Sequence, residues 1–141
     1  MADTIVLHYD VDGQDFTLAG ATSAKVKKYL KQLGLPPEVI RRVAIAMYEA
    51  EINMVIHADG GTIDVEISPD SVHIIFSDKG PGIPDIEKAM QEGFSTATNE
   101  IRELGFGAGM GLPNIKMYSD KMNIDTVVGE GTTIELFINI V

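Results

Sequence analysis

The order of apolar and polar positions along the chain predicts two kinds of element. Strict alternation of apolar and polar residues, which is typical of half-buried strands, recurs near both ends and in the middle. Apolar residues spaced three and four apart indicate helices, which stop at glycine or proline. We predict strands at Thr4–Val11, Gln14–Leu18, Thr62–Ser68, Val72–Ser77, Met122–Val128 and Thr132–Ile140, and helices at Ala21–Leu33, Pro37–His57, Ile86–Glu92 and Gly111–Lys121.

Short turns join neighbouring strands at Asp12-Gly13, at Pro69-Asp70 and at Gly129–Gly131, and such turns favour antiparallel hairpins. The regular alternation of strand and helix that builds a wound parallel sheet does not occur. The predicted fold class is therefore α/β of the α+β kind: a two-layer sandwich with a mixed, mostly antiparallel sheet and helices packed on one face. A length of 141 residues predicts a single domain, 1–141.

Composition narrows the classes of function. The chain has 21 acidic and 11 basic side chains, a formal charge of −10, which argues against binding of nucleic acid or of an anionic membrane. It has no cysteine, which excludes disulfides, thiolate metal sites and cysteine nucleophiles. No apolar run approaches the roughly 20 residues of a membrane span, and the first residues lack a secretory pattern. We therefore expect a cytoplasmic protein.

The basic residues are concentrated in one part of the chain. Between residues 25 and 42 lie six of the eleven: Lys25, Lys27, Lys28, Lys31, Arg41 and Arg42. The cluster is either a solvated helix face or a docking surface for an acidic partner.

The helix predicted at Pro37–His57 is apolar on almost every face, which indicates that it is mostly buried. Glu49 and Asn53 interrupt it four residues apart and share one face. Burying an unpaired carboxylate is costly, so Glu49 needs a partner, a metal ion, water or a cleft. The alternative is an ordinary polar pair at the helix edge, bonded to a neighbouring loop. Glu51 points elsewhere, and nothing in the pattern singles it out.

Two glycine-containing segments are candidates for ligand binding. Asp78–Gly82 follows a predicted strand, where an aspartate can accept a hydrogen bond from a ligand amine and glycine allows close approach. Gly105–Gly111 has glycine at every second position and leads into a helix, an arrangement that can bind an anion. It fits neither the dinucleotide-binding nor the P-loop fingerprint. Taken singly, the first segment is also compatible with a tight turn, and the second with a flexible lid.

Taken together and in this order, the motifs resemble those of the GHKL (Bergerat-fold) ATPases. Glu49–Asn53 resembles the N box, Asp78–Gly82 the G1 box, Gly105–Gly111 the G2 box, and Gly129–Thr132 the closing GxGT element. The resemblance extends over about residues 37–139. Within the superfamily the chain is most similar to the serine/threonine kinases of bacterial sigma-factor control, of the RsbT, RsbW and SpoIIAB types.

The similarity is greatest to the RsbT type, and it lies in residues 78–86, 90–96, 111–116 and 127–132. One segment departs from that type. Ala97–Leu104 is longer than expected, which leaves the behaviour of the lid and the choice of partner open.

The resemblance implies ATP and Mg²⁺ as ligands and assigns a role to each motif. Asp78 would accept a hydrogen bond from the adenine amine, in a pocket that Gly80, Gly82 and Thr132 complete. Asn53 would bind Mg²⁺, and Glu49 would be the general base for phosphoryl transfer. Backbone amides of the G2 box would hold the phosphates, at Gly105, Gly107, Gly109 and Gly111.

The same resemblance implies a kinase that phosphorylates a Ser or Thr of a STAS-domain antagonist. The alternative is a nucleotide-gated anti-sigma-type protein that sequesters a sigma factor or another regulator with little catalysis. A homodimer is compatible with either. We expect structural rather than catalytic roles for His8, His57 and His73, which argues against an intact histidine kinase.

Overall fold

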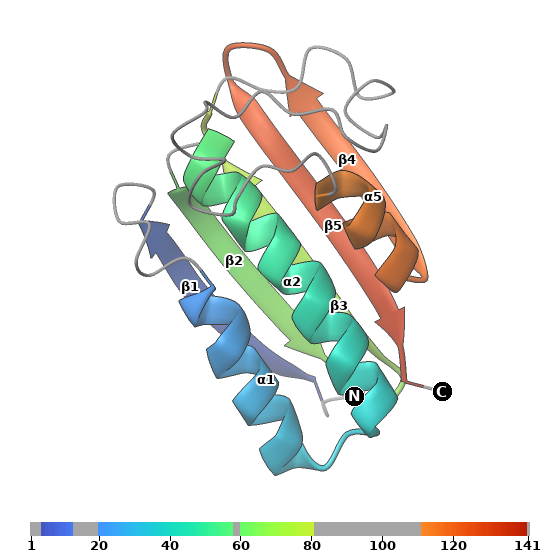
Figure 1. Ribbon diagram of the computed structural model, residues 1–141. Helices are drawn as coiled ribbons and strands as arrows, with labels where there is room; N and C mark the ends of the chain where they lie inside the picture. The colour runs from blue at the N-terminus through green and yellow to red at the C-terminus, as the bar shows by residue number, and fades with distance from the viewer. Residues whose placement is uncertain (1–3, 13–19, 58–59, 81–110, 141) are drawn as a thin grey trace.

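A computed structural model of the chain describes residues 4–12, 20–57, 60–80 and 111–140. Over these residues, helices cover one face of a five-stranded sheet with strand order β1-β2-β3-β5-β4 (Figure 1). The elements are β1 (Ile5–Asp12), α1 (Ala21–Leu33), α2 (Pro37–His57), β2 (Gly60–Ile67), β3 (Ser71–Asp78), α5 (Gly111–Tyr118), β4 (Lys121–Val127) and β5 (Gly131–Asn139).

Every strand pair in the described sheet is antiparallel. The predicted two-layer sandwich with helices on one face is therefore confirmed, and the described sheet has no parallel component. The strand predicted at Gln14–Leu18, the helix at Ile86–Glu92 and the segment 93–109 lie outside the described residues.

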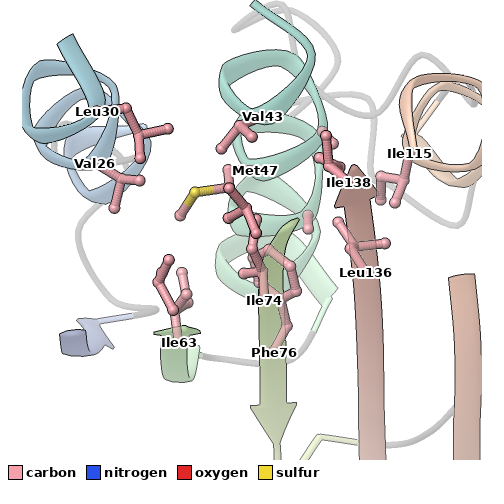
Figure 2. Close-up of a cluster of buried hydrophobic side chains, with 14 of the residues drawn as sticks. Val26, Leu30, Val43, Met47, Ile63, Ile74, Phe76, Ile115, Leu136 and Ile138 are labelled. Carbon is pink, nitrogen blue, oxygen red and sulfur yellow. The ribbon is translucent and has the colours of Figure 1, made fainter. Parts of the chain in front are cut away.

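The core lies between the sheet and the helices. Alternate residues of the strands point to the helices and are buried, as period-two patterning requires. Figure 2 shows how these side chains meet those of the helices. The fully buried members include Val26, Leu30, Val43, Met47, Ile63, Ile74, Ile115, Leu136 and Ile138.

α2 crosses the middle of the sheet, with α1 on one side of it and α5 on the other (Figure 1). Its apolar residues are buried on several faces, which explains why the sequence pattern is hydrophobic nearly all round. The predicted bounds Pro37–His57 are those observed. Because α2 is fixed on both sides and beneath, the polar side chains that it carries are held on a rigid element.

The end of α5 corrects the predicted helix, which was expected to continue to Lys121. The helix ends at Tyr118 because the hydroxyl of Ser119 donates to the carbonyl of Ile115 at 2.5 Å and competes with the backbone. The N–H of Asp120 then bonds the carbonyl of Phe137 at 2.8 Å, and sheet pairing begins. Among the described helices, none is long and apolar enough to span a membrane.

Candidate functional site

Glu49 and Asn53 lie one turn apart on α2, and both are half-buried. Burial raises the pKa of the Glu49 carboxyl above its ordinary value, and a hydrogen bond with the side chain of Asn114 partly opposes this. Asn114 belongs to the first turns of α5, so Glu49 of the predicted polar pair faces the helix that follows the glycine-rich segment. Asn114 was not among the predicted site residues.

Asp78 is the last residue of β3 and lies opposite Thr132 of β5. Its Oδ1 accepts the backbone N–H of Gly80 at 2.9 Å and that of Thr132 at 3.2 Å. Both hydrogen bonds end on Oδ1, and neither uses Oδ2. Within the described part of the chain, Oδ2 is therefore left to accept a hydrogen bond from a ligand.

Two glycines let the neighbouring backbones close around the end of β3. A Cβ on Gly131, where φ is +143°, would overlap the carbonyl oxygen of Asp78. A Cβ on Gly61, where φ is +155°, would overlap the carbonyl oxygen of Ser77. Gly61 was not predicted as a site residue, although a Gly-Gly pair at the start of a strand is a signal for such close approach.

Gly61 also lies between the two parts of the candidate site, the second half of α2 and the end of β3. A Cβ at this position would lie 2.7 Å from Cε of Met54 and 3.1 Å from Cα of Asp78. Since Met54 follows Asn53 directly, the second half of α2 lies over the end of β3. Figure 1 shows the same end of the molecule, where β3 ends and β5 begins. The structure thus brings the predicted Glu49–Asn53 pair and Asp78 to one end of the sandwich.

Thr132 is 7% exposed, and its side chain is fixed from β4. Its Oγ1 lies 2.8 Å from Oγ1 of Thr126, whose hydroxyl is also 3.2 Å from the carbonyl oxygen of Gly131. Its backbone N–H holds Asp78, and its side chain joins this end of β5 to β4.

Of the predicted glycines, Gly80 contacts Asp78 and Gly111 begins α5. Gly82, Gly105, Gly107 and Gly109 lie outside the described residues. The contact between Asn114 and Glu49 brings the beginning of α5 against the Glu49 face of α2. A ligand held at the N-terminus of α5 would therefore be near Glu49.

The described residues contain no group of three His, Asp or Glu side chains arranged to hold a metal ion. Asn53 nevertheless offers an amide oxygen, a donor of the oxygen type that Mg²⁺ prefers. Mg²⁺ is commonly held by one or two protein oxygens, with ligand phosphates and water completing its shell. The donor set therefore fits an ion that arrives with a phosphate ligand.

Glu51 was passed over in the sequence, yet it is the most buried acidic side chain described, at 1% exposure. Its carboxylate accepts three backbone N–H groups at the start of α1, from Gly20, Thr22 and Ser23, at 3.0, 3.1 and 2.9 Å. Gly20 occupies the N-cap position and has no side chain to cap the helix, so Glu51 supplies the cap from α2. This contact positions α1 and does not belong to the candidate site.

The two described histidine rings bind carboxylates on the face of the sheet away from the helices. His8 bonds Asp64 at 2.5 Å, and His73 lies 2.9 Å from Glu66 and from Glu135. Neither ring is near Glu49, as the expected structural role requires. The side chain of His57 is outside the described residues.

The family of histidine kinase-like ATPase domains matches residues 15–138. The chain belongs to this family. The ATPase domain is 38% identical over 109 residues to the serine/threonine-protein kinase RsbT of Bacillus subtilis, with 74% of this chain and 76% of RsbT covered. It is 34% identical over 116 residues to an anti-sigma F factor of a Thermoanaerobacter species, covering 79% of this chain and 78% of that factor.

A solved structure supports the fold independently. The crystal structure of the RsbU and RsbW domains of a Mycobacterium tuberculosis protein matches 95% of this ATPase domain with a TM-score of 0.62. The identity is 19%, so the likeness concerns the fold alone, and the domain spans about a third, 32%, of that chain.

These comparisons confirm the predicted GHKL family, its fold and the similarity to RsbT. The protein is thus an ATP-binding domain of the serine/threonine kinase and anti-sigma-factor type. The roles of the individual site residues remain predictions.

Proposed function

We propose that this protein is a serine/threonine kinase of a bacterial partner-switching system, which transfers the γ-phosphoryl group of ATP to a Ser or Thr of a STAS-domain antagonist. The observation that carries the proposal is the position of Glu49. It is half-buried on α2, has a raised pKa, and lies one turn from Asn53 and beside the start of α5. The similarity to RsbT, which is named a serine/threonine-protein kinase, supports the reaction class.

In the proposed complex the adenine base binds at Asp78. Oδ2 of Asp78 accepts a hydrogen bond from the exocyclic amine of adenine. The N–H groups of Gly80 and Thr132 hold Oδ1 in place. Gly82 leaves room for the ring. An aspartate fixed by two backbone donors loses little freedom when the ligand binds, which favours affinity.

The phosphates bind at the glycine-rich segment, to backbone amides of Gly105, Gly107, Gly109 and Gly111, at the N-terminus of α5. Asn53 contributes its amide oxygen to Mg²⁺. When bound, Mg²⁺ offsets the negative charge of the phosphates. No basic side chain is then required at the phosphates, which agrees with the acidic composition of the chain.

Glu49 acts as the general base. It removes the proton of the acceptor hydroxyl as that oxygen bonds to the γ-phosphorus and the bond from phosphorus to the leaving ADP oxygen breaks. A base works best when its pKa is close to the working pH, and burial moves the pKa of Glu49 in that direction. Asn53 and the amides of the glycine-rich segment position the phosphoryl group.

The partner docks on α1 in this proposal. Four lysines, Lys25, Lys27, Lys28 and Lys31, are exposed on this helix, and none forms an ion pair with a described residue. The remaining bases of the cluster are occupied, because Arg41 pairs with Glu38 and Arg42 with Asp120. An uncompensated basic face on a protein of charge −10 favours an acidic protein surface.

The second candidate function is sequestration of a sigma factor or another regulator. The similarity to an anti-sigma F factor favours it, and the basic face of α1 would serve it equally. A homodimer is compatible with both functions. Both functions depend on ATP, which is available in the cytoplasm, so we propose a cytoplasmic location in either case.

The decisive experiment incubates the protein with Mg-ATP and the STAS-domain protein encoded nearest to its gene. We expect one phosphoserine or phosphothreonine on that protein, identified by mass spectrometry. A tight ATP-dependent complex without phosphorylation would instead support sequestration.

The same assay tests the docking surface. The double variant Lys27→Glu, Lys28→Glu should weaken binding of the partner. The control variant Lys116→Glu, at an exposed position on α5, should not.

A further inference from the structure

α5 is a short helix whose direction depends on contacts with the rest of the fold. It has eight residues, Gly111–Tyr118, and a helix of this length is marginal on its own. Among the side chains of α5 that the structure describes, only that of Ile115 is fully buried. A single buried side chain holds a helix against the core but does not by itself fix the direction of the helix axis. A second contact is needed for that.

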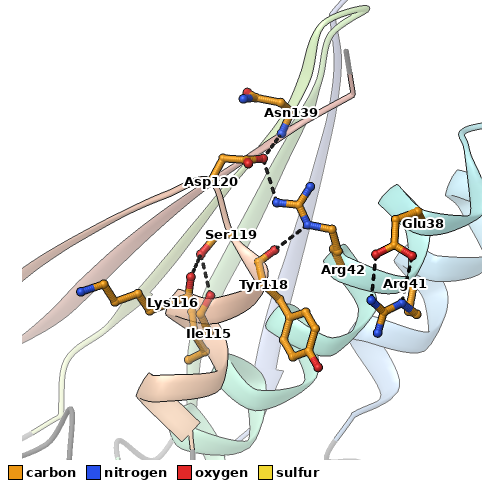
Figure 3. A network of polar contacts seen from close by, with 9 residues as sticks. All are labelled: Glu38, Arg41, Arg42, Ile115, Lys116, Tyr118, Ser119, Asp120 and Asn139. Atoms are coloured by element: carbon orange, nitrogen blue, oxygen red, sulfur yellow. Dashed lines mark hydrogen bonds and ion pairs between the residues drawn. The ribbon is translucent and has the colours of Figure 1, made fainter.

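The second contact comes from Arg42 of α2 (Figure 3). Its Nε donates to the carbonyl of Tyr118, the last residue of α5, at 3.2 Å. The last carbonyls of a helix lack partners within the helix and carry a partial negative charge, so a guanidinium satisfies one of them and is attracted to that end. α2 therefore caps the C-terminus of α5 through Arg42, as it caps the N-terminus of α1 through Glu51.

Asp120 holds the guanidinium in place from the sheet. Nη2 of Arg42 lies 2.9 Å from Oδ2 of Asp120, and the same oxygen accepts the N–H of Asn139 at 2.7 Å (Figure 3). The N–H of Asp120 bonds the carbonyl of Phe137 at 2.8 Å. Asp120 is thus bound to β5 through both its main chain and its side chain. The Arg42–Asp120 pair therefore joins α2, the end of α5 and the end of β5.

This anchor lies on the helix that carries the predicted base and metal ligand. Glu49 follows Arg42 by seven residues on α2, and Asn53 follows four residues later. The other end of α5, at Gly111, is where the proposed function places the phosphates. Eight residues extend over about 12 Å, so a tilt of about 10° at the anchored end would displace the beginning of α5 by roughly 2 Å. The contact at Tyr118 therefore controls the position of the far end of the helix.

We propose that Arg42 is a positioning residue for ATP: it fixes the direction of α5 and so places the backbone N–H groups at the beginning of this helix for the phosphates. The proposal rests on the proposed function, which assigns the phosphates to α5 and the adenine to Asp78. The printed contacts of Arg42 are with Tyr118 and Asp120, and within the described residues they do not include Asp78. Arg42 should therefore control the affinity for the phosphates and not that for adenosine.

The test measures the Kd for ATP and the Kd for adenosine by calorimetry, with Mg²⁺ present. Arg42→Met removes the guanidinium, and because the Arg42 side chain is only 23% exposed, the apolar methionine can take its place. Arg42→Lys keeps the charge but not the planar fork that bonds two acceptors. Asp120→Ala removes the partner. Lys121→Met is the control, since Lys121 is exposed on β4 and carries the same charge as Arg42.

We expect Arg42→Met to raise the Kd for ATP by roughly threefold to tenfold, the scale of ordering one additional group on binding. Arg42→Lys should have a smaller effect. The Kd for adenosine should not change in any variant, and Lys121→Met should bind both ligands as the wild-type protein does. A role in stability alone would lower the Tm without separating the two ligands.

The sign of the effect of Asp120→Ala separates positioning from simple charge attraction. Arg42→Met removes a positive charge and Asp120→Ala removes a negative one, so long-range attraction of ATP would weaken in the first variant and strengthen in the second. Loss of the anchor should weaken the binding of ATP in both variants. Stronger binding of ATP by Asp120→Ala would therefore contradict the proposal.

An unchanged Kd for ATP in folded Arg42→Met, or equal losses for ATP and adenosine, would also overturn the positioning role. The measurement needs neither a partner nor phosphoryl transfer. If the wild-type protein transfers no phosphoryl group while the loss specific to ATP is observed, the kinase function is refuted and the positioning role stands. The two failures are therefore distinguishable.

Discussion

The carboxylate of Glu51 accepts the backbone N–H of Ser23 at 2.9 Å, which joins the start of α1 to the helix that carries Glu49 and Asn53. The same carboxylate accepts two further N–H groups, so it replaces a cap that Gly20 cannot provide. The first turn of α1 therefore depends on a residue 28 positions later in the chain.

We expect Glu51→Ala to lower the free energy of unfolding by about 3 kcal/mol, because it leaves several buried N–H groups without an acceptor. Glu51→Gln keeps one acceptor oxygen and should cost less. The exposed Glu38→Ala is the control, and urea denaturation measures all three variants. If Glu51→Ala unfolds at the same urea concentration as the wild-type protein, the capping role is wrong.

The contrast between Glu49 and Glu51 shows what the sequence could reveal. Glu49 could be predicted as a site residue because it shares a helix face with Asn53 and both fall within a motif of known order. Glu51 belongs to no pattern, since its partners are backbone N–H groups of α1 that lie far away in the chain. A contact between a side chain and backbone groups far away in the chain produces no regular spacing of residue types, so it cannot be predicted from the sequence pattern.

The fold itself was largely predictable. The bounds of α1 and α2 follow from apolar spacing and from glycine and proline at their ends, and both match the observed helices. The end of α5 was missed because Ser119 and Asp120 stop the helix through contacts with a carbonyl and with β5. Asn114 was not predicted because its position near Glu49 depends on how two helices pack.

Asp78→Asn should weaken ATP binding by at least roughly tenfold, the scale of one hydrogen bond to a charged group. The side-chain oxygen of the introduced amide could still accept the two N–H groups, but its NH₂ group would face the adenine amine, and two donors repel. Calorimetry would measure the Kd, with the exposed Asp70→Asn as control. Equal affinity in Asp78→Asn and wild type would remove Asp78 from the adenine site.

Gly131→Ala should be much more harmful than Gly129→Ala. Both positions have positive φ, +143° and +85°, so each substitution strains the backbone, by about 1–3 kcal/mol. A Cβ at Gly131 would in addition overlap the carbonyl of Asp78, whereas at Gly129 it would meet no atom within 4 Å. For Gly131→Ala, the Tm of thermal unfolding and the affinity for ATP should both fall. For Gly129→Ala, the Tm should fall slightly and the affinity for ATP should not change. Equal losses in the two variants would contradict the close contact.

The Arg42–Asp120 contact predicts a stability change in acid. Because the N–H of Asn139 and the guanidinium of Arg42 lower the pKa of Asp120, the contact stabilises the fold above the unfolded pKa, near 3.8. That contribution is lost as pH falls through the lower folded value. Asp120→Asn should therefore be less stable than wild type at pH 7, and the difference should shrink on acidification to about pH 2. A difference that stays constant over this range would show that the charge of Asp120 does not matter.

The pH dependence of transfer tests Glu49 directly. Burial raises its pKa above the ordinary 4.5, and the base must be ionised, so activity should be lost as pH falls through that raised value. The acid limb of the kcat profile should thus have its midpoint above 4.5. Glu49→Ala should bind ATP with nearly unchanged Kd and lose transfer by roughly a hundredfold or more, the usual contribution of a general base. Glu66→Ala, on the opposite face of the sheet, is the control and should keep the wild-type profile. If Glu49→Ala retained near-original transfer with an unaltered acid limb, another group would have to be the base.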